Sequence, residues 1–228
     1  FSVELVNAVI LFDYFKGTLP EFPAGKPLFI FASHFHADHY APVIFQLGEK
    51  RENVFYILSK EIGKKIPEEY RKRYKDRIRL GKAGERFCLN ISEESLIVET
   101  FHSTDEGVAF WLSCEGKEIY HAGDLNNWWW EGEDMAWNRN MAASYKQEMK
   151  KLSGRTADLA FIPVDPRQEQ WFYLGAAGFM EQADAKWIFP MHFWEDYTII
   201  PKLIEHPSSE GWRDRIVEIH KEGEEFIR

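Results

Sequence analysis

The sequence predicts a layered α/β fold for this chain of 228 residues. Short apolar runs rich in Val, Ile, Phe and Tyr are typical of strands, and the longer amphipathic segments between them are typical of helices. Elements that alternate in this way favour helices packed on sheets. The chain has no repeat, low-complexity tract or Pro/Ser/Gly-rich linker, so we expect residues 1–228 to form a single domain.

The individual elements follow from the same patterns. Nine apolar runs bounded by turn residues are predicted to be strands: 3–15, 26–33, 53–59, 95–101, 107–113, 117–123, 157–164, 185–191 and 215–221. Only Cys114, Glu115 and Gly116 separate two of these runs, which indicates a hairpin. Four segments are predicted to be helices: 42–49, 141–152, 171–183 and 197–205. In the second of these, Met149 and Leu152 lie on the apolar side.

Composition limits the class of protein. Hydrophobic residues make up 45% of the chain and charged residues 29%, which excludes a disordered polymer. The net charge of −9 argues against wholesale binding to nucleic acid or to an anionic membrane. No apolar run reaches the roughly 18 residues of a membrane span. We therefore expect a cytoplasmic protein with a small-molecule substrate. The composition does not decide whether it forms a homo-oligomer.

Two further features concern the compartment and the chain start. Cys88 and Cys114 are the only cysteines and form no C-x-x-C pair, so we expect two buried thiols in a reducing compartment. The first residues lack the basic region and cleavage site of a signal peptide. Because the sequence does not begin with Met, we expect further N-terminal residues to precede it.

The segment from Lys60 to Lys82 is basic within an acidic chain. It contains ten basic and four acidic residues, a local net charge of +6. One interpretation is a helix that faces phosphate groups or RNA. The alternative, which we favour, is a solvated helix face with ion pairs four residues apart, such as Glu61 with Lys65 and Glu68 with Lys72.

The string SHFHADHY at residues 33–40 contains four potential metal ligands: His34, His36, Asp38 and His39. It follows the apolar run PLFIFA, which is predicted to be a buried strand. Alternate residues of an extended segment share a face, so His34 and His36 can point the same way, while Asp38 and His39 can reach a second point. Neutral imidazoles and a carboxylate suit Zn²⁺ first, and Mn or Fe less selectively.

Three further potential ligands follow other apolar runs. His102 comes after SLIVETF, Asp124 after KEIYHAG and His192 after AKWIFPM. Open α/β sheets place their sites beyond strand ends, so we expect these three side chains to join the first four. A single histidine is more often structural than a ligand, and the remaining histidines are interpreted as core or surface groups: His121, His206 and His220.

This order of residues, H-x-H-x-D-H followed by a spaced His, Asp and His, resembles the metallo-β-lactamase superfamily of metallohydrolases over nearly the whole chain. The compact length and the string PMHF look most like its UlaG-like group. The resemblance implies a four-layer αββα sandwich with the metal site at one edge of the two sheets. It implies two divalent metal ions per chain, one held by His34, His36 and His102 and the other by Asp38, His39 and His192. Asp124 would bridge the two ions, and Asp13 would support a ligand histidine.

The function implied by the resemblance is a metal-dependent hydrolase. Two cations about 3.5–4 Å apart lower the pKa of a bridging water, and the resulting hydroxide attacks an ester, lactone or phosphoester. Asp38 and Asp124 are the expected catalytic residues, Asp38 by orienting the hydroxide or passing on its proton. The β-lactam-cleaving members commonly carry Cys at the position of Asp124, so an antibiotic-degrading enzyme is not expected. A nucleic-acid phosphodiesterase and a non-catalytic metal sensor or scaffold remain as alternatives.

The residues around the site are predicted less sharply. The Trp-rich segment 125–140, which includes Trp128, could line a pocket, form an interface with a second subunit or cover the core. Arg167 could bind a phosphate or carboxylate, although a pair with Asp165 that fixes the loop is slightly favoured. Tyr173 is a weaker pocket candidate.

Overall fold

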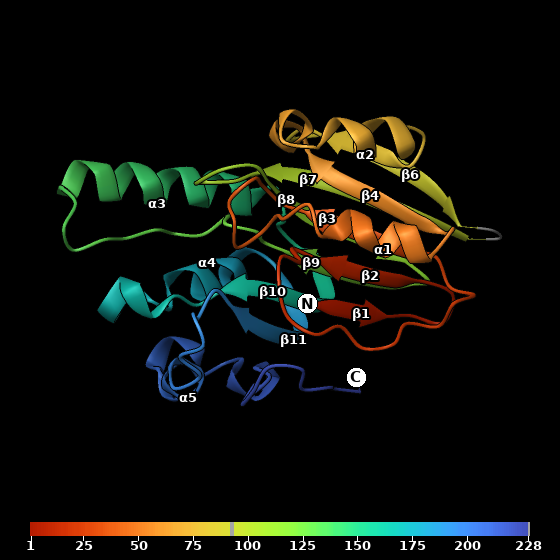
Figure 1. Cartoon of the computed structure of the whole chain (residues 1–228). Helices are drawn as coiled ribbons and strands as arrows, with labels where there is room; N and C mark the ends of the chain where they lie inside the picture. The colour runs from red at the N-terminus through yellow and green to blue at the C-terminus, as the bar shows by residue number, and fades with distance from the viewer. Residues whose placement is uncertain (92–93, 228) are drawn as a thin grey trace. The chain divides into compact units, whose positions relative to one another are not determined.

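A computed structural model describes residues 1–91 and 94–227 of the chain (Figure 1). The described strands lie in two mixed sheets, of five and six strands, and helices accompany them, which confirms the predicted α/β class. The chain divides into two compact units. Unit 1 comprises residues 1–102 and 106–116, and unit 2 comprises residues 103–105 and 117–228. The single domain expected from the sequence stays a prediction.

The five-stranded sheet belongs to unit 1. Its strands, in spatial order, are β1 (Ser2–Glu4), β2 (Val9–Phe12), β3 (Leu28–Ala32), β4 (Val54–Ser59) and β5 (Ile78–Gly81). The strands from β2 to β5 run parallel, and every residue of β2 and β3 is buried. Continuous apolar runs of this kind are typical of parallel strands covered on both faces. The single strand predicted at 3–15 is wrong, because β1 and β2 are antiparallel and a turn from Leu5 to Ala8 joins them.

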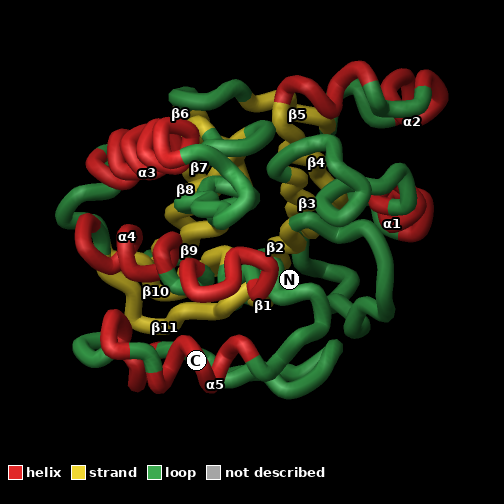
Figure 2. The backbone as a smooth tube through the Cα atoms, turned by 90° about the vertical axis from the view of Figure 1, so that its left-hand side faces the viewer, coloured by secondary structure: helices red, strands yellow, loops and turns green. Residues whose placement is uncertain are grey.

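Two short helices flank this sheet, α1 (Ile44–Lys50) and α2 (Glu68–Arg73) (Figure 2). The ring of Phe45 in α1 is fully buried and lies 4.7 Å from the ring of Tyr56 on β4 and 4.9 Å from that of Tyr70 on α2. These aromatic contacts fix both helices against the strands.

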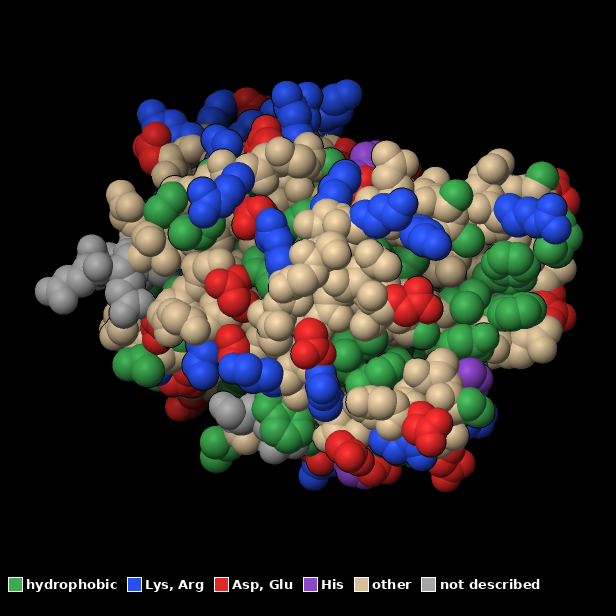
Figure 3. Space-filling model, turned by 180° about the vertical axis from the view of Figure 1, so that it is seen from behind, with side chains coloured by type: hydrophobic (Ala, Val, Ile, Leu, Met, Phe, Trp, Pro, Cys, Tyr) green, Lys and Arg blue, Asp and Glu red, His purple; other side chains and the backbone are tan. Residues whose placement is uncertain are grey.

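The basic segment 60–82 is not one helix, contrary to the prediction. It consists of a 3-10 helix, η1 (Lys60–Lys64), then α2, then β5. Pro67 immediately precedes α2, and its missing N–H and fixed φ prevent a continuous helix from running through this position. Figure 3 shows Lys and Arg side chains gathered with some Asp and Glu along the upper edge of the view, where α2 lies.

Three antiparallel strands complete unit 1: β6 (Arg86–Ile91), β7 (Glu94–His102) and β8 (Val108–Cys114). Strand β6 was not predicted from the sequence, because the polar residues in RFCLNI interrupt its apolar pattern. Cys88 on β6 is exposed, so the prediction of two buried thiols is wrong for this residue, whereas Cys114 is buried as predicted.

Unit 2 contains three parallel strands: β9 (Lys117–His121), β10 (Thr156–Pro163) and β11 (Asp184–Met191). Its helices are α3 (Met135–Lys150), α4 (Leu174–Gln182) and α5 (Ile199–Glu205), with 3-10 turns η2 (Pro166–Trp171), η3 (Pro207–Ser209) and η4 (Arg213–Arg215). Helix α4 contacts β10, β11 and α3. None of the described helices has the length and hydropathy of a membrane span.

Two predictions in unit 2 need correction. Helix α3 begins earlier than residue 141, because the Asp134 side chain accepts a hydrogen bond from the Trp137 N–H at 2.7 Å and caps the helix there. The strand predicted at 215–221 is wrong, since this segment makes only an isolated bridge between Ile216 and Ile188.

The ends of the parallel strands position the candidate ligands. In unit 1, Asp13 follows β2 and the string from His34 follows β3. In unit 2, Asp124, Asp165 and His192 follow β9, β10 and β11. Parallel strands have their carboxyl ends at the same edge of a sheet, so within each unit these side chains come from one edge.

Candidate metal centre

In unit 1, one carboxylate and one hydroxyl orient two histidines. The Asp13 carboxylate accepts the Ser33 N–H and the Ser33 Oγ–H, each at 2.7 Å, and its Oδ2 lies 2.7 Å from Nδ1 of His39. Ser33 Oγ also lies 3.0 Å from Nδ1 of His34. The arrangement is satisfied when both imidazoles carry their proton on Nδ1, and in this tautomer Nε2 is the nitrogen with a lone pair that can bind a metal ion. The resemblance implied such a role for Asp13.

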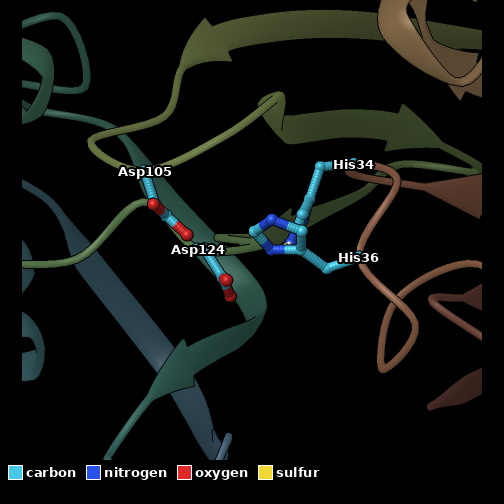
Figure 4. A group of neighbouring side chains, drawn as sticks. All are labelled: His34, His36, Asp105 and Asp124. Carbon is cyan, nitrogen blue, oxygen red and sulfur yellow. Dashed lines mark hydrogen bonds between the residues drawn. The ribbon is translucent and has the colours of Figure 1, made fainter.

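The remaining ligand candidates of unit 1 lie against these two imidazoles. Nε2 of His34 is 3.0 Å from Nδ1 of His36, and the two rings meet edge to face (Figure 4). Asp38 Oδ2 lies 3.6 Å from Nε2 of His39. His34 and His39 are buried, whereas the side chain of Asp38 is 30% exposed and can be reached by solvent.

Unit 2 repeats this arrangement with different residues. His192 Nδ1 lies 2.8 Å from Oδ2 of Asp165, and its Nε2 lies 3.5 Å from Oδ1 of Asp124. Both aspartates are buried. The backbone of His192 has φ of 63°, a left-handed conformation that is uncommon for a residue with a side chain. The backbone turns at this residue directly after β11, and the imidazole is fixed by its contact with Asp165.

Asp165 was predicted only as a partner of Arg167. The pair is present, since the Arg167 guanidinium donates to both carboxylate oxygens at 2.5–3.0 Å. Burial alone would raise the pKa of Asp165, but hydrogen bonds from His192 and Arg167 outweigh it and lower this pKa to about 2. The sequence did not predict the contact with His192, although Asp165 follows a buried strand, which was the available signal.

Tryptophan rings surround this part of unit 2. Trp128 is buried, donates from Nε1 to the Asp124 carbonyl at 2.9 Å and lies edge-on to His192 with ring centres 5.4 Å apart. Trp130 stacks on Trp128 at 5.6 Å. Trp194 lies 5.1 Å from the His192 ring. The Trp-rich segment therefore packs locally beside a candidate ligand, while the predicted roles in substrate or subunit contacts stay predictions.

Three other sequence candidates have different surroundings. His102 is the last residue of β7 and is exposed. Tyr173 stacks on His206 with ring centres 4.0 Å apart, and its predicted substrate role stays a prediction. His121 is buried and accepts the Gly123 N–H at 3.1 Å, as expected of a core histidine.

The donor geometry of both units fits a small divalent cation. Ligand atoms that each lie 2.0–2.2 Å from a tetrahedral ion are separated from one another by about 3.3–3.6 Å. The Asp38/His39 and Asp124/His192 pairs have separations of 3.6 and 3.5 Å, within this range, whereas the His34 and His36 nitrogens are closer, at the hydrogen-bond distance of 3.0 Å. Each imidazole that presents Nε2 has its other nitrogen against an oxygen, the usual support for a ligand histidine. Nitrogen and carboxylate donors of this kind accept Zn, Fe and Mn.

The fold and these donors define an α/β protein with a candidate metal centre. No protein-family model matches the chain, and no curated protein sequence matches it. Solved structures do. CmlA, a diiron β-hydroxylase from Streptomyces venezuelae, is similar with a TM-score of 0.56 and 12% identity over 96% of this chain and 51% of that one. A mutant of CmlA is similar with a TM-score of 0.50 and 12% identity, over 84% of this chain and 44% of that one.

A weaker likeness is to YhfI from Bacillus subtilis, which carries the name of a metallo-β-lactamase fold protein. Its TM-score is 0.47 and its identity 10%, over 84% of this chain and 77% of that one. The chain spans about half the length of the CmlA chains it matches. At this identity the likeness to CmlA shows a shared fold and nothing about the reaction. The UlaG-like group predicted from the sequence stays a prediction.

Proposed function

We propose that this protein is a metal-dependent hydrolase of small molecules, with a dinuclear site built from the seven side chains that the sequence predicts. They are His34, His36, Asp38, His39, His102, Asp124 and His192. The observation that carries the proposal is the orientation of three imidazoles. His34, His39 and His192 each have Nδ1 against an oxygen of Ser33, Asp13 or Asp165, so that Nε2 is the nitrogen that would bind a cation.

Bound divalent ions would lower the pKa of a water molecule and polarise the carbonyl or phosphoryl group of a substrate. The residues of the chain would hold and assist this chemistry. Asp13 and Asp165 are negative charges that keep their histidines in one tautomer and one orientation. Asp38 is partly exposed and can accept a proton from an attacking water. The buried indole of Trp128 excludes solvent beside His192.

The test is metal analysis of the purified protein followed by a panel of esters, lactones and phosphodiesters. We expect close to two divalent ions per chain, zinc first, and hydrolysis of at least one substrate class. His34→Ala and Asp124→Ala should each lose metal and activity, whereas His220→Ala, at an exposed position, should keep both. Full metal content in both of the first two variants would contradict the proposed ligand set.

A metal-dependent oxidation is the second candidate, because the candidate ligands also suit iron and the similar structure CmlA is named a diiron β-hydroxylase. The imidazole and carboxylate ligands of the candidate site suit iron as well as zinc. Hydrolysis needs no oxygen, so product formation in an anaerobic chamber separates the two. Turnover that requires iron, oxygen and a reductant, with none in the zinc form, would replace the hydrolase proposal.

Nucleic-acid cleavage is less well supported, because several cations of the basic segment already have partners. Arg71 donates to the carbonyl oxygens of Gly63 and Ile66, and Lys72 pairs with Glu68 at 2.6 Å. Neutralising these side chains should leave binding of a labelled RNA unchanged. A parent protein that binds RNA at low salt, with binding lost in that variant, would favour the nuclease.

A further inference from the structure

The loop between β7 and β8 carries a carboxylate, Asp105, that is not among the seven ligands predicted from the sequence. An oxygen of Asp105 lies within 4.8 Å of an oxygen of Asp124, and both residues belong to unit 2 (Figure 4). Asp124 is buried and also lies 3.5 Å from the imidazole Nε2 of His192. Two ionised carboxylates at this separation repel each other, and a cation between them removes the repulsion.

Hydrogen bonds fix Asp105 in this place. The Thr104 hydroxyl donates to the Asn126 carbonyl at 2.6 Å and accepts the Asn126 N–H at 3.0 Å. Ser103 is buried, and its Oγ accepts the Asp105 N–H at 3.1 Å. The backbone of the loop is thereby attached to the segment that follows β9, which places the Asp105 carboxylate beside Asp124 although the side chain is exposed.

His102, three residues earlier, is the ligand that the resemblance implies at this point of the sequence. His102 belongs to unit 1 with the rest of β7 and is exposed, as Asp105 is, but it is not among the described residues whose donor atoms lie within 4.8 Å of one another. Asp105 belongs to unit 2 and lies close to a buried aspartate that is itself in contact with His192. An oxygen donor in place of an imidazole keeps a set that Zn, Fe and Mn accept.

We propose that Asp105 is a metal ligand together with Asp124, and that it takes the coordination position that the resemblance gives to His102. This assignment rests on the proposed function and replaces His102 by Asp105 in its set of ligands. It predicts that the metal depends on the carboxylate of Asp105 and not on the imidazole of His102.

The test compares Asp105→Asn with His102→Gln and with Glu106→Gln, an adjacent exposed acid as matched control. Zinc content and affinity are measured by competition with a chromophoric chelator, and the ligand field by the visible spectrum of the Co²⁺-loaded protein. In Asp105→Asn we expect at least about a 10-fold loss of affinity at one ion and a changed Co²⁺ spectrum. His102→Gln and Glu106→Gln should match the parent in both.

Circular dichroism of the metal-free proteins checks that all variants fold. If Asp105→Asn had the zinc affinity and the Co²⁺ spectrum of the parent, the assignment of Asp105 would be overturned but the proposed function would not. Loss of metal in His102→Gln would have the same consequence. A parent protein that binds no divalent metal would overturn the proposed function and this assignment with it.

Discussion

Asp165 Oδ2 lies 2.8 Å from Nδ1 of His192, and the two residues follow the adjacent parallel strands β10 and β11. Asp165 is fully buried and also receives the Arg167 guanidinium. With its pKa lowered to about 2, the carboxylate stays ionised throughout the neutral range. The imidazole therefore has a permanent acceptor on one side and presents its other nitrogen towards Asp124.

Removing this acceptor should weaken metal binding. Asp165→Asn keeps the size of the side chain but replaces the charge, so the tautomer and orientation of His192 are no longer enforced. We expect metal affinity to fall by about 10–100-fold, the range typical of such outer partners. Chelator competition measures it, with Asp158→Asn, another acid of unit 2, as control. Equal affinity in the parent and Asp165→Asn would show that the hydrogen bond does not act on the metal.

Metal binding should also stabilise the fold. A ligand that binds only the native state adds about 2.7 kcal/mol at a concentration 100 times its Kd. For a chain of this size that corresponds to a rise in Tm of about 5–10 °C. Thermal melts of the zinc-loaded protein with and without a strong chelator measure the difference. The Tm of His34→Ala should change little when zinc is added. If the chelator left the Tm of the parent unchanged, the proposed metal ligands would be contradicted.

The sequence predicted the positions of the candidate site better than its supporting contacts. His34, Asp124 and His192 each follow an apolar run, and in the structure each comes after the strand that this run forms. Such runs can be recognised locally, because burial on both faces leaves a continuous apolar pattern. The contact of Asp165 with His192 depends on the pairing of β10 with β11, which no local pattern encodes.

The misses have similar causes. Asp105 is brought to Asp124 by hydrogen bonds of Thr104, a residue without any periodic signature. The segment 215–221 has the alternation of a strand, but it makes only an isolated bridge, at Ile216. Whether an apolar run becomes a strand is decided by the availability of a partner edge, which is a tertiary property.

Gly107 is the position where the fold beside the histidine cluster is least tolerant of a side chain. Its φ is +72°, and a Cβ would lie 2.0 Å from the Ser33 carbonyl oxygen and 2.6 Å from Cβ of His34. Gly107→Ala therefore combines backbone strain with displacement of His34. Gly84→Ala is the matched control, because Gly84 has φ of +79° with nothing within 4 Å of its Cβ.

In the control variant Gly84→Ala, the free energy of unfolding should fall only by the cost of backbone strain, about 1–2 kcal/mol. Gly107→Ala should lose clearly more free energy of unfolding in urea, and its zinc affinity should fall as well. Equal losses in the two variants would mean that the segment around Ser33 can move aside without cost.

The pH dependence of stability can be tested at a pair outside the metal centre. Asp158 Oδ1 lies 2.7 Å from Nζ of Lys186, and Oδ2 accepts the Glu118 N–H at 2.9 Å. Burial alone would raise the pKa of Asp158, but these hydrogen bonds outweigh it, and the pKa lies below the ordinary value of 3.8. A carboxyl whose pKa is lowered on folding stabilises the protein above its unfolded pKa, and this contribution disappears as the pH falls through the folded pKa.

Asp158→Asn should therefore lower the free energy of unfolding at pH 7 by about 0.5–1 kcal/mol, a small effect because Lys186 is exposed. The difference from the parent should stay constant down to about pH 5 and shrink below 3.8, since protonation then removes the same charge from the parent. Urea denaturation at several pH values measures it, and Lys186→Gln should reproduce part of the loss at pH 7. A difference that grows as the pH falls would have the wrong sign for an aspartate stabilised in its ionised form.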